Sequence, residues 1–134
     1  MILHTIPPVY DESSRVLILG SFPSVRSREV GFFYGHPQNR FWRTLSHVLC
    51  QREPQTVEEK KDFLLANHIA LWDVIASCEI VGSSDQSIRN AIPNDLTPIL
   101  ASARIERIYT NGGTAHRLYR QTQIIPPVPL TPRQ

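Results

Sequence analysis

The segment RVLILGSFPS, residues 15–24, decides the class of fold that this chain adopts. Its first part is a continuous apolar run that ends at Gly20. Its second part contains Pro23, which has no backbone N–H to donate to a strand ladder. A short, fully apolar run is typical of a strand buried on both faces, as in parallel sheets. The segment therefore predicts a buried strand that runs into a loop.

Two later segments have the same character. IALWDVI at residues 69–75 and IERIYT at residues 105–110 predict two further strands, and the second is followed by the turn residues Asn111-Gly112-Gly113. Parallel strands bring their ligand-binding loops together at their carboxyl ends. We therefore expect the important loops at residues 20–38, 73–90 and 111–114.

Helical patterns lie between these segments. Apolar residues at positions 41, 42, 45, 48 and 49 form one stripe of a helix that begins near Asn39. Thr56 and Glu59 have the spacing of a capping box, which predicts a helix that continues to about Asn67. Helical spacing also occurs at 96–103 and 115–119. This alternation predicts a three-layer α/β/α fold with a parallel sheet.

Length and composition indicate one cytoplasmic domain over residues 1–134. The chain is 41% hydrophobic and 19% charged, which is enough apolar material for a core. It contains no apolar run long enough for a membrane span and no signal-peptide pattern at its start. Cys50 and Cys78 lack the CxxC spacing of a metal site, so we expect two reduced, mostly buried thiols and no metal.

Charge is distributed unevenly along the chain. Residues 1–52 carry a net charge of +3, residues 53–103 carry −5 and residues 104–134 carry +4. Of the 14 basic residues 12 are arginines, whose planar guanidinium group suits forked contacts with phosphate. If both basic ends fold onto one face, that face suits an anionic polymer; the alternative is ordinary surface charge.

The densest chemical cluster is GFFYGHPQNRFW at residues 31–42. Phe41 and Trp42 belong to the apolar helix stripe and are expected in the core. Tyr34 precedes the helix and is the better candidate to stack on an unpaired base. Asn39 has two possible roles, because Asn is also a favoured helix N-cap that accepts a free backbone N–H.

Four segments, taken in order, carry a resemblance to a known family. GSFPS at 20–24, YGHPQNRFW at 34–42, LWDVI at 71–75 and Asn111-Gly112 resemble the uracil-DNA glycosylase superfamily, and within it the hypoxanthine-DNA (deoxyinosine) glycosylase branch. The resemblance implies a central, mainly parallel four-stranded sheet. It also implies hydrolysis of the N-glycosidic bond of a deaminated base, above all hypoxanthine, flipped out of DNA. It implies no cofactor and no metal, and we expect a monomer.

The resemblance also implies roles for single residues. In the mismatch-specific branch the first loop is GINPG, and its Asn positions the attacking water; Phe22 occupies that place here and cannot do so. The hypoxanthine branch relies on the Asn of its HPxNRFW string, which corresponds to Asn39. Tyr34 falls where the mismatch-specific branch has a base-stacking Phe. His36 either donates to the base or holds its loop together. Asp73 is a reserve candidate, for which a structural role is the favoured interpretation.

The predicted site therefore has three parts. Asn39 is the catalytic residue. The base pocket is assigned to Gly20, Ser21, Phe22, Pro23, Ser24, Tyr34, His36 and Asn111. The contacts to the DNA backbone are assigned to Arg26, Arg28, Arg40 and Arg43.

The end of the chain departs from the family pattern. The superfamily has a second motif, of a form like LPSTSPAN in this branch, whereas this chain ends in PLTPRQ at 129–134. We therefore expect a truncated domain with an incomplete last strand and final helix. The alternative function is a catalytically inactive, nucleic-acid-binding remnant. A mononucleotide-binding domain is disfavoured because there is no GxxxxGK[ST] or GxGxxG loop.

Overall fold

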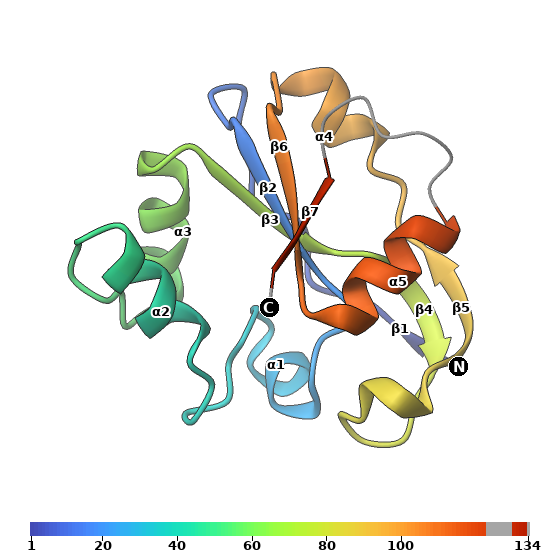
Figure 1. Cartoon of the computed structure of the whole chain (residues 1–134). Helices are drawn as coiled ribbons and strands as arrows, with labels where there is room; N and C mark the ends of the chain where they lie inside the picture. The colour runs from blue at the N-terminus through green and yellow to red at the C-terminus, as the bar shows by residue number, and fades with distance from the viewer. Residues whose placement is uncertain (123–129, 134) are drawn as a thin grey trace.

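The computed structural model describes residues 1–122 and the backbone of residues 130–133. A parallel sheet forms its centre, in the strand order β3-β2-β6-β7 (Figure 1). Its three five-residue strands are β2 (Val16–Gly20), β3 (Ile69–Asp73) and β6 (Arg107–Asn111). The α/β/α class and the parallel sheet are confirmed. The expected four-stranded centre is corrected to three strands, with β7 (Leu130–Arg133) as a short strand at the edge.

β2 lies between β3 and β6, in register with both. Val16 is opposite Ile69 on one side and opposite Arg107 on the other. Alternate residues of β2 face opposite sides of the sheet, since Leu17 and Leu19 belong to one core cluster and Ile18 to the other. This two-sided burial explains why the run is apolar at every position.

The segment expected as one strand over residues 69–75 is two strands. β3 ends at Asp73, and β4 (Ile75–Glu79) belongs to a second, antiparallel sheet with β1 (Ile2–Leu3) and β5 (Arg89–Pro93). The side-chain amide of Asn94 donates to the carbonyls of Asp73 and Ile75, at 2.9 and 3.2 Å, on either side of the change of direction. Apolar periodicity is the same in both strands, so it does not show where the chain changes sheets.

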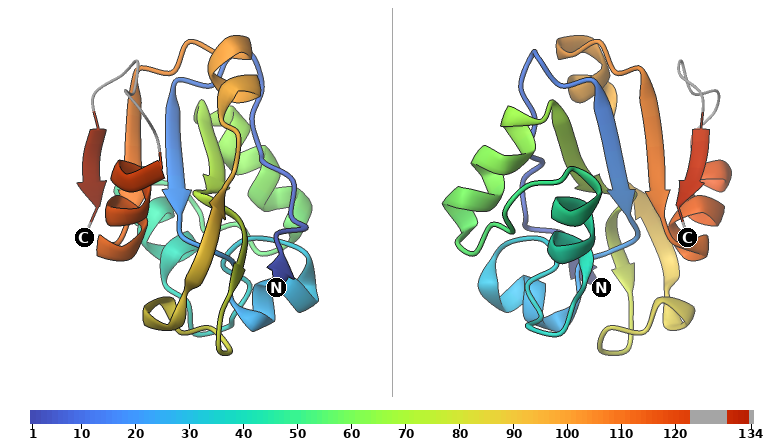
Figure 2. Two further views of the ribbon diagram at one scale, coloured as in Figure 1. Left: turned by 90° about the vertical axis from the view of Figure 1, so that its right-hand side faces the viewer. Right: turned by 60° about the vertical axis from the view of Figure 1, so that its left-hand side comes forward.

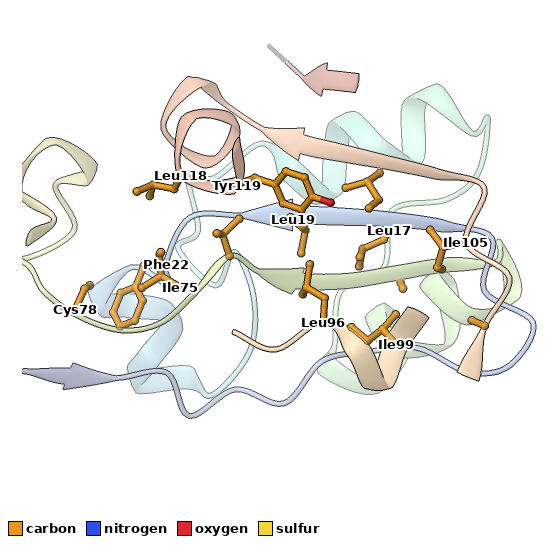
Figure 3. Close-up of a cluster of buried hydrophobic side chains, with 14 of the residues drawn as sticks. Leu17, Leu19, Phe22, Ile75, Cys78, Leu96, Ile99, Ile105, Leu118 and Tyr119 are labelled. Carbon is orange, nitrogen blue, oxygen red and sulfur yellow. The ribbon is translucent and has the colours of Figure 1, made fainter. Parts of the chain in front are cut away.

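Helices cover both faces of the parallel sheet (Figure 2). α2 (Phe41–Val48) and α3 (Val57–Ala66) pack on the face of Ile18. α4 (Thr97–Ser102) and α5 (Gly113–Thr122) pack on the opposite face, where their apolar side chains meet those of β2 (Figure 3). The predicted capping box at Thr56 is present, since its hydroxyl accepts from Glu59 N at 3.0 Å and the Glu59 carboxylate accepts from Thr56 N. All four predicted helices are present. Three of them begin and end within two residues of the prediction, whereas α5 ends three residues beyond the predicted 115–119.

Two short helices lie in segments expected to be loops. α1 (Val25–Val30) follows the GSFPS segment, and η1 (Asp85–Ser87) follows β4. Ser24 caps α1, because its hydroxyl accepts from Ser27 N at 3.1 Å. α1, η1 and the loop before α2 all lie near the carboxyl ends of the parallel strands (Figure 1).

Two compositional expectations have different outcomes. Cys78 is buried as expected, whereas Cys50 is exposed, so the expectation of two buried thiols is wrong for Cys50. Among the residues that the structure describes, no helix combines the length and the apolar character required to cross a membrane.

Candidate active site

A cavity of about 230 Å³ opens at the carboxyl ends of the parallel strands. Gly20, Asp73 and Asn111 are the last residues of β2, β3 and β6, and all three line it. β3 lies on one side of β2 and β6 lies on the other. The chain segments that leave the ends of these neighbouring strands therefore run in different directions, and the cavity lies between them. Parallel α/β sheets bind their ligands at this place, outside the strand ends.

The carboxyl of Asp73 is enclosed by protein at the floor of the cavity. Asp73 is only 3% exposed, and its Oδ2 lies 2.8 Å from His4 Nε2. Burial raises the pKa of Asp73, and the nearby carboxylate of Asp85 acts in the same direction, while the hydrogen bond from His4 opposes them. An ionisable side chain held out of water at the end of a strand is a candidate functional group.

His4 is itself held in one orientation. Its Nδ1 accepts from the backbone N–H of Ile6 at 3.3 Å, so the ring proton is on Nε2 and is donated to Asp73. The rings of Phe22, Phe33 and Trp72 lie around the imidazole at centroid distances of 5.9 to 6.1 Å. The position of the Asp73 carboxyl is therefore set by a rigid, buried partner.

Gly20 leaves room for two polar groups in the floor. A β-carbon at this position would overlap Asp73 Oδ1 and would lie 2.8 Å from the hydroxyl of Tyr34. That hydroxyl also accepts from Asn111 Nδ2 at 3.0 Å. The absent side chain of Gly20 thus allows groups from β3, β6 and the loop before α2 to meet at one place.

Tyr34 lines the cavity in a constrained conformation. Its φ of 53° is in the left-handed region, and its ring is stacked on Phe41 with centroids 4.0 Å apart. Phe41 and Trp42 are 5% and 3% exposed, which confirms that they belong to the core. Tyr34 is therefore a ring fixed against the core at the wall of the cavity.

Asn39 lies directly before Arg40, the N-cap residue of α2, and lines the cavity, so the expectation that Asn39 is itself the N-cap is wrong. Its Oδ1 accepts from Phe41 N, the first amide of α2, at 2.8 Å. The residue is otherwise exposed and is part of the cavity wall. The side chain of Asn39 thus accepts the first backbone N–H of α2 from one residue before the N-cap, and this hydrogen bond orients its amide group at the cavity wall.

His36 lies apart from the cavity lining. It is exposed, its Nδ1 accepts from Gln38 N at 3.1 Å, and its carbonyl accepts from Asn39 N at 2.9 Å. These contacts hold the loop that presents Asn39, which is the second of the two roles considered for His36.

The family of this chain is decided by comparison with known proteins. A family model described as the uracil DNA glycosylase superfamily matches residues 7–131. The chain belongs to the uracil DNA glycosylase superfamily.

Two proteins with related sequences come from species of Methanosarcina. A hypoxanthine DNA glycosylase of Methanosarcina acetivorans is 38% identical over 98 residues, covering 72% of this chain and 62% of that protein. A hypoxanthine DNA glycosylase of Methanosarcina barkeri is 35% identical over 102 residues, covering 70% and 64%. The chain thus matches less than two thirds of the length of these curated relatives.

A solved structure shows the same fold as this superfamily chain. The solution NMR structure of a candidate uracil DNA glycosylase from Methanosarcina acetivorans superimposes with a TM-score of 0.77 at 33% sequence identity. The match covers 94% of this chain and 84% of the other.

The superfamily fold brings together eight of the nine residues predicted for catalysis and base binding, all except His36. Five further residues line the cavity: Ser27, Phe33, Asp73, Ser83 and Asp85. Ser21 Oγ donates to Asp85 Oδ1 at 2.8 Å, and Ser83 Oγ accepts from Val25 N at 2.9 Å. The only sequence signal for Ser83 and Asp85 is their place in the loop at residues 73–90, which joins the site by tertiary contact.

The four arginines predicted to contact DNA differ in their surroundings. Arg28 donates to the carbonyl of Gly82 at 2.8 Å and lies over the ring of Phe22, so it ties α1 to the loop after β4. Arg43 forms an ion pair with Glu53, in which Nε lies 3.8 Å from Oε1. Arg26 and Arg40 are exposed. Within the described residues, no group of three or more His, Cys, Asp or Glu side chains is placed to hold a metal ion.

Proposed function

We propose that this chain is a monofunctional DNA glycosylase that hydrolyses the N-glycosidic bond of deoxyinosine and releases hypoxanthine. The observation that carries the proposal is the cavity at the strand ends, which has Asn39, Tyr34 and a buried carboxyl in its lining. Its volume of about 230 Å³ suits one flat ring system rather than a drug-sized ligand, which needs roughly 300–1,000 Å³. The related proteins named hypoxanthine DNA glycosylase support the same base.

The proposed substrate is a deaminated base flipped out of DNA, since the cavity is a recess that a stacked base does not enter. Exposed Arg26 and Arg40 are proposed to contact phosphates beside the flipped nucleotide. Tyr34 is proposed to contact the face of the base, since aromatic side chains stack on bases with about 1–3 kcal/mol per base. We also place the enzyme in the cytoplasm as a monomer acting on DNA.

The bond to be broken connects C1′ of the sugar to N9 of the purine. As it breaks, its electron pair leaves with the base, positive charge develops on the sugar, and the oxygen of a water molecule bonds to C1′. One water proton goes to the base and the other stays as the new hydroxyl. Asn39 is proposed to orient this water, because the hydrogen bond from Phe41 N fixes the amide before the substrate arrives.

The test measures hypoxanthine release from a deoxyinosine oligonucleotide in single turnover. Asn39→Ser removes the amide but keeps a side-chain oxygen that can accept from Phe41 N, and Asn39→Ala removes both. We expect both variants to lose about 10²–10³-fold in rate, the loss typical of one preorganised polar group. Only Asn39→Ala should also lose stability, by about 1 kcal/mol.

Two results would contradict this assignment. If Asn39→Ser released hypoxanthine at the wild-type rate, the hydrogen bond from Phe41 N would be the whole role of Asn39. If the wild-type chain bound DNA in a salt-sensitive manner but released no base at high protein concentration, the inactive nucleic-acid-binding remnant would be the correct alternative.

A further inference from the structure

The charged side chains in the lining of the cavity are all of one sign. Two of the lining residues are acidic, Asp73 and Asp85, and within the part of the chain that the structure describes none of them is Lys, Arg or His. Arg26 and Arg40, which are proposed to contact phosphates, are not in this lining. The cavity therefore differs in charge from the side chains proposed to bind the DNA backbone.

Asp85 is the acidic residue that the proposed reaction leaves without a role and that water reaches. Asp85 is exposed, whereas Asp73 is buried. Its Oδ1 accepts a hydrogen bond from Ser21 Oγ at 2.8 Å. Among residues 1–122, no Lys, Arg or His side chain forms an ion pair with Asp85. The negative charge of Asp85 is thus not neutralised by a neighbouring cation in these residues.

The loop that carries Asp85 is joined to α1 by two further hydrogen bonds. Ser83 Oγ accepts from Val25 N at 2.9 Å, and the carbonyl of Gly82 accepts from Arg28 at 2.8 Å. The guanidinium of Arg28 is directed to this carbonyl and is not part of the cavity lining. The carboxylate of Asp85 therefore has a defined position at the cavity wall.

The effect of Asp85 on a second negative charge is visible within the protein itself. Burial and the carboxylate of Asp85 both raise the pKa of Asp73. The other titratable or charged groups nearby are His4, Cys78, Arg28 and the amino terminus. A negatively charged base in the same cavity meets the same repulsion, which is stronger where water is excluded. The cavity thus favours a base that carries no charge.

Deaminated bases differ in the pH at which they become anions. Hypoxanthine and uracil keep their ring protons well above neutral pH. Xanthine, the product of guanine deamination, has two oxo groups and loses a ring proton near neutral pH. Of these three bases, only xanthine is therefore substantially anionic under neutral conditions.

We propose that Asp85 is a specificity-determining residue whose carboxylate makes the cavity accept neutral deaminated bases and reject the anionic form of xanthine. This inference rests on the proposed function. It predicts that discrimination against xanthine increases as the pH rises and the base ionises. A cavity that merely lacked room for the second oxo group would reject xanthine equally at every pH.

The first arm of the test measures binding, so that the ease of bond breaking does not enter. Two uncleavable 2′-fluoroarabino oligonucleotides carry hypoxanthine or xanthine at the same position. The ratio of the xanthine Kd to the hypoxanthine Kd is measured below and above the pH at which xanthine ionises. For the wild-type chain we expect this ratio to rise ~10- to 100-fold, the effect of one like charge in a cavity. A ratio that does not change with pH would overturn the assignment.

The second arm changes the protein. Asp85→Asn removes the charge and keeps an oxygen that can accept from Ser21 Oγ, and Asp85→Ser removes the charge with a different side chain. We expect the rise in the ratio to shrink to ~3-fold or less in both variants. Asp62→Asn, on the exposed surface of α3, removes an equal charge outside the cavity and should show the wild-type rise. A wild-type rise in Asp85→Asn or Asp85→Ser would overturn the role of Asp85.

Measuring base release as well separates this inference from the proposed function. A rise in the ratio that is lost in Asp85→Asn supports the role of Asp85 even if no base is released. Release of hypoxanthine together with a ratio that is independent of pH overturns only the role of Asp85. Absence of both binding and release overturns the proposed function and this assignment with it.

Discussion

Gly20→Ala is the substitution that most directly tests how the cavity is built. The added β-carbon would overlap Asp73 Oδ1 and lie 2.8 Å from the Tyr34 hydroxyl, closer than real β-carbons approach other atoms. Neither neighbour moves freely. Asp73 is held by His4 at 2.8 Å and the Tyr34 hydroxyl by Asn111 at 3.0 Å. The substitution therefore acts on two hydrogen-bonded groups at once.

The size of the effect follows from this geometry. Overpacking by one methyl group typically costs about 1–3 kcal/mol, and here both displaced atoms are polar groups that would lose alignment with their partners. For a chain of this length, that cost lowers the midpoint of thermal unfolding by roughly 3–15 °C. Activity should fall more steeply than stability, because the same methyl group fills the floor on which the base is proposed to lie.

The assay pairs thermal unfolding with single-turnover release of hypoxanthine. Gly113→Ala is the control, since nothing lies within 4 Å of a β-carbon at Gly113 and Ala favours the first turn of α5. It should be stable to the same degree as wild type or more, by up to about 1 kcal/mol, with unchanged release. If Gly20→Ala melted and reacted like Gly113→Ala, Asp73 and Tyr34 would not be held against Gly20 as described.

Two further predictions concern charge. Burial raises the pKa of Asp73 in the folded chain, and the titratable groups that act on it are His4 and Asp85. The contribution of Asp73 to the stability of the fold is therefore greatest below its unfolded pKa of 3.8. This contribution is lost as the pH rises through the folded pKa. Urea unfolding over a pH series should therefore show Asp73→Asn gaining stability relative to wild type as the pH rises from about 4, and a constant or shrinking difference would contradict this cause. Arg26→Ala should leave the free energy of unfolding unchanged and lower, by about 1, the slope of the logarithm of DNA affinity against the logarithm of salt concentration. Arg28→Ala removes the hydrogen bond to the Gly82 carbonyl and should destabilise the fold by about 1 kcal/mol. The reverse pattern would exchange the roles of the two arginines.

The fold was largely predictable from local patterns. Strands such as Val16–Gly20 are apolar on both faces because helices cover both faces, and the helix at Val57–Ala66 begins with a capping box whose contacts are local. The division of residues 69–79 between two sheets was not predictable, because both strands are apolar and the contact that bridges them comes from Asn94, 19 and 21 residues away.

The candidate site, like the fold, was predictable only in part from the sequence. Residues 20–24 follow a predicted strand and residues 34–39 precede a predicted helix, so both were recognised as loops. Residues 20–24, Tyr34 and Asn39 line the cavity. The partnership of His4 with Asp73 joins residues 69 apart in the chain, and the bond between Ser21 and Asp85 joins residues 64 apart. Hydrophobic periodicity and turn chemistry report on neighbours along the chain, so they identified the strands, the helices and the loops. Which carboxyl is buried in the cavity lining and which histidine holds it were decided only when packing brought distant segments together, since burial and hydrogen bonding are properties of the assembled core.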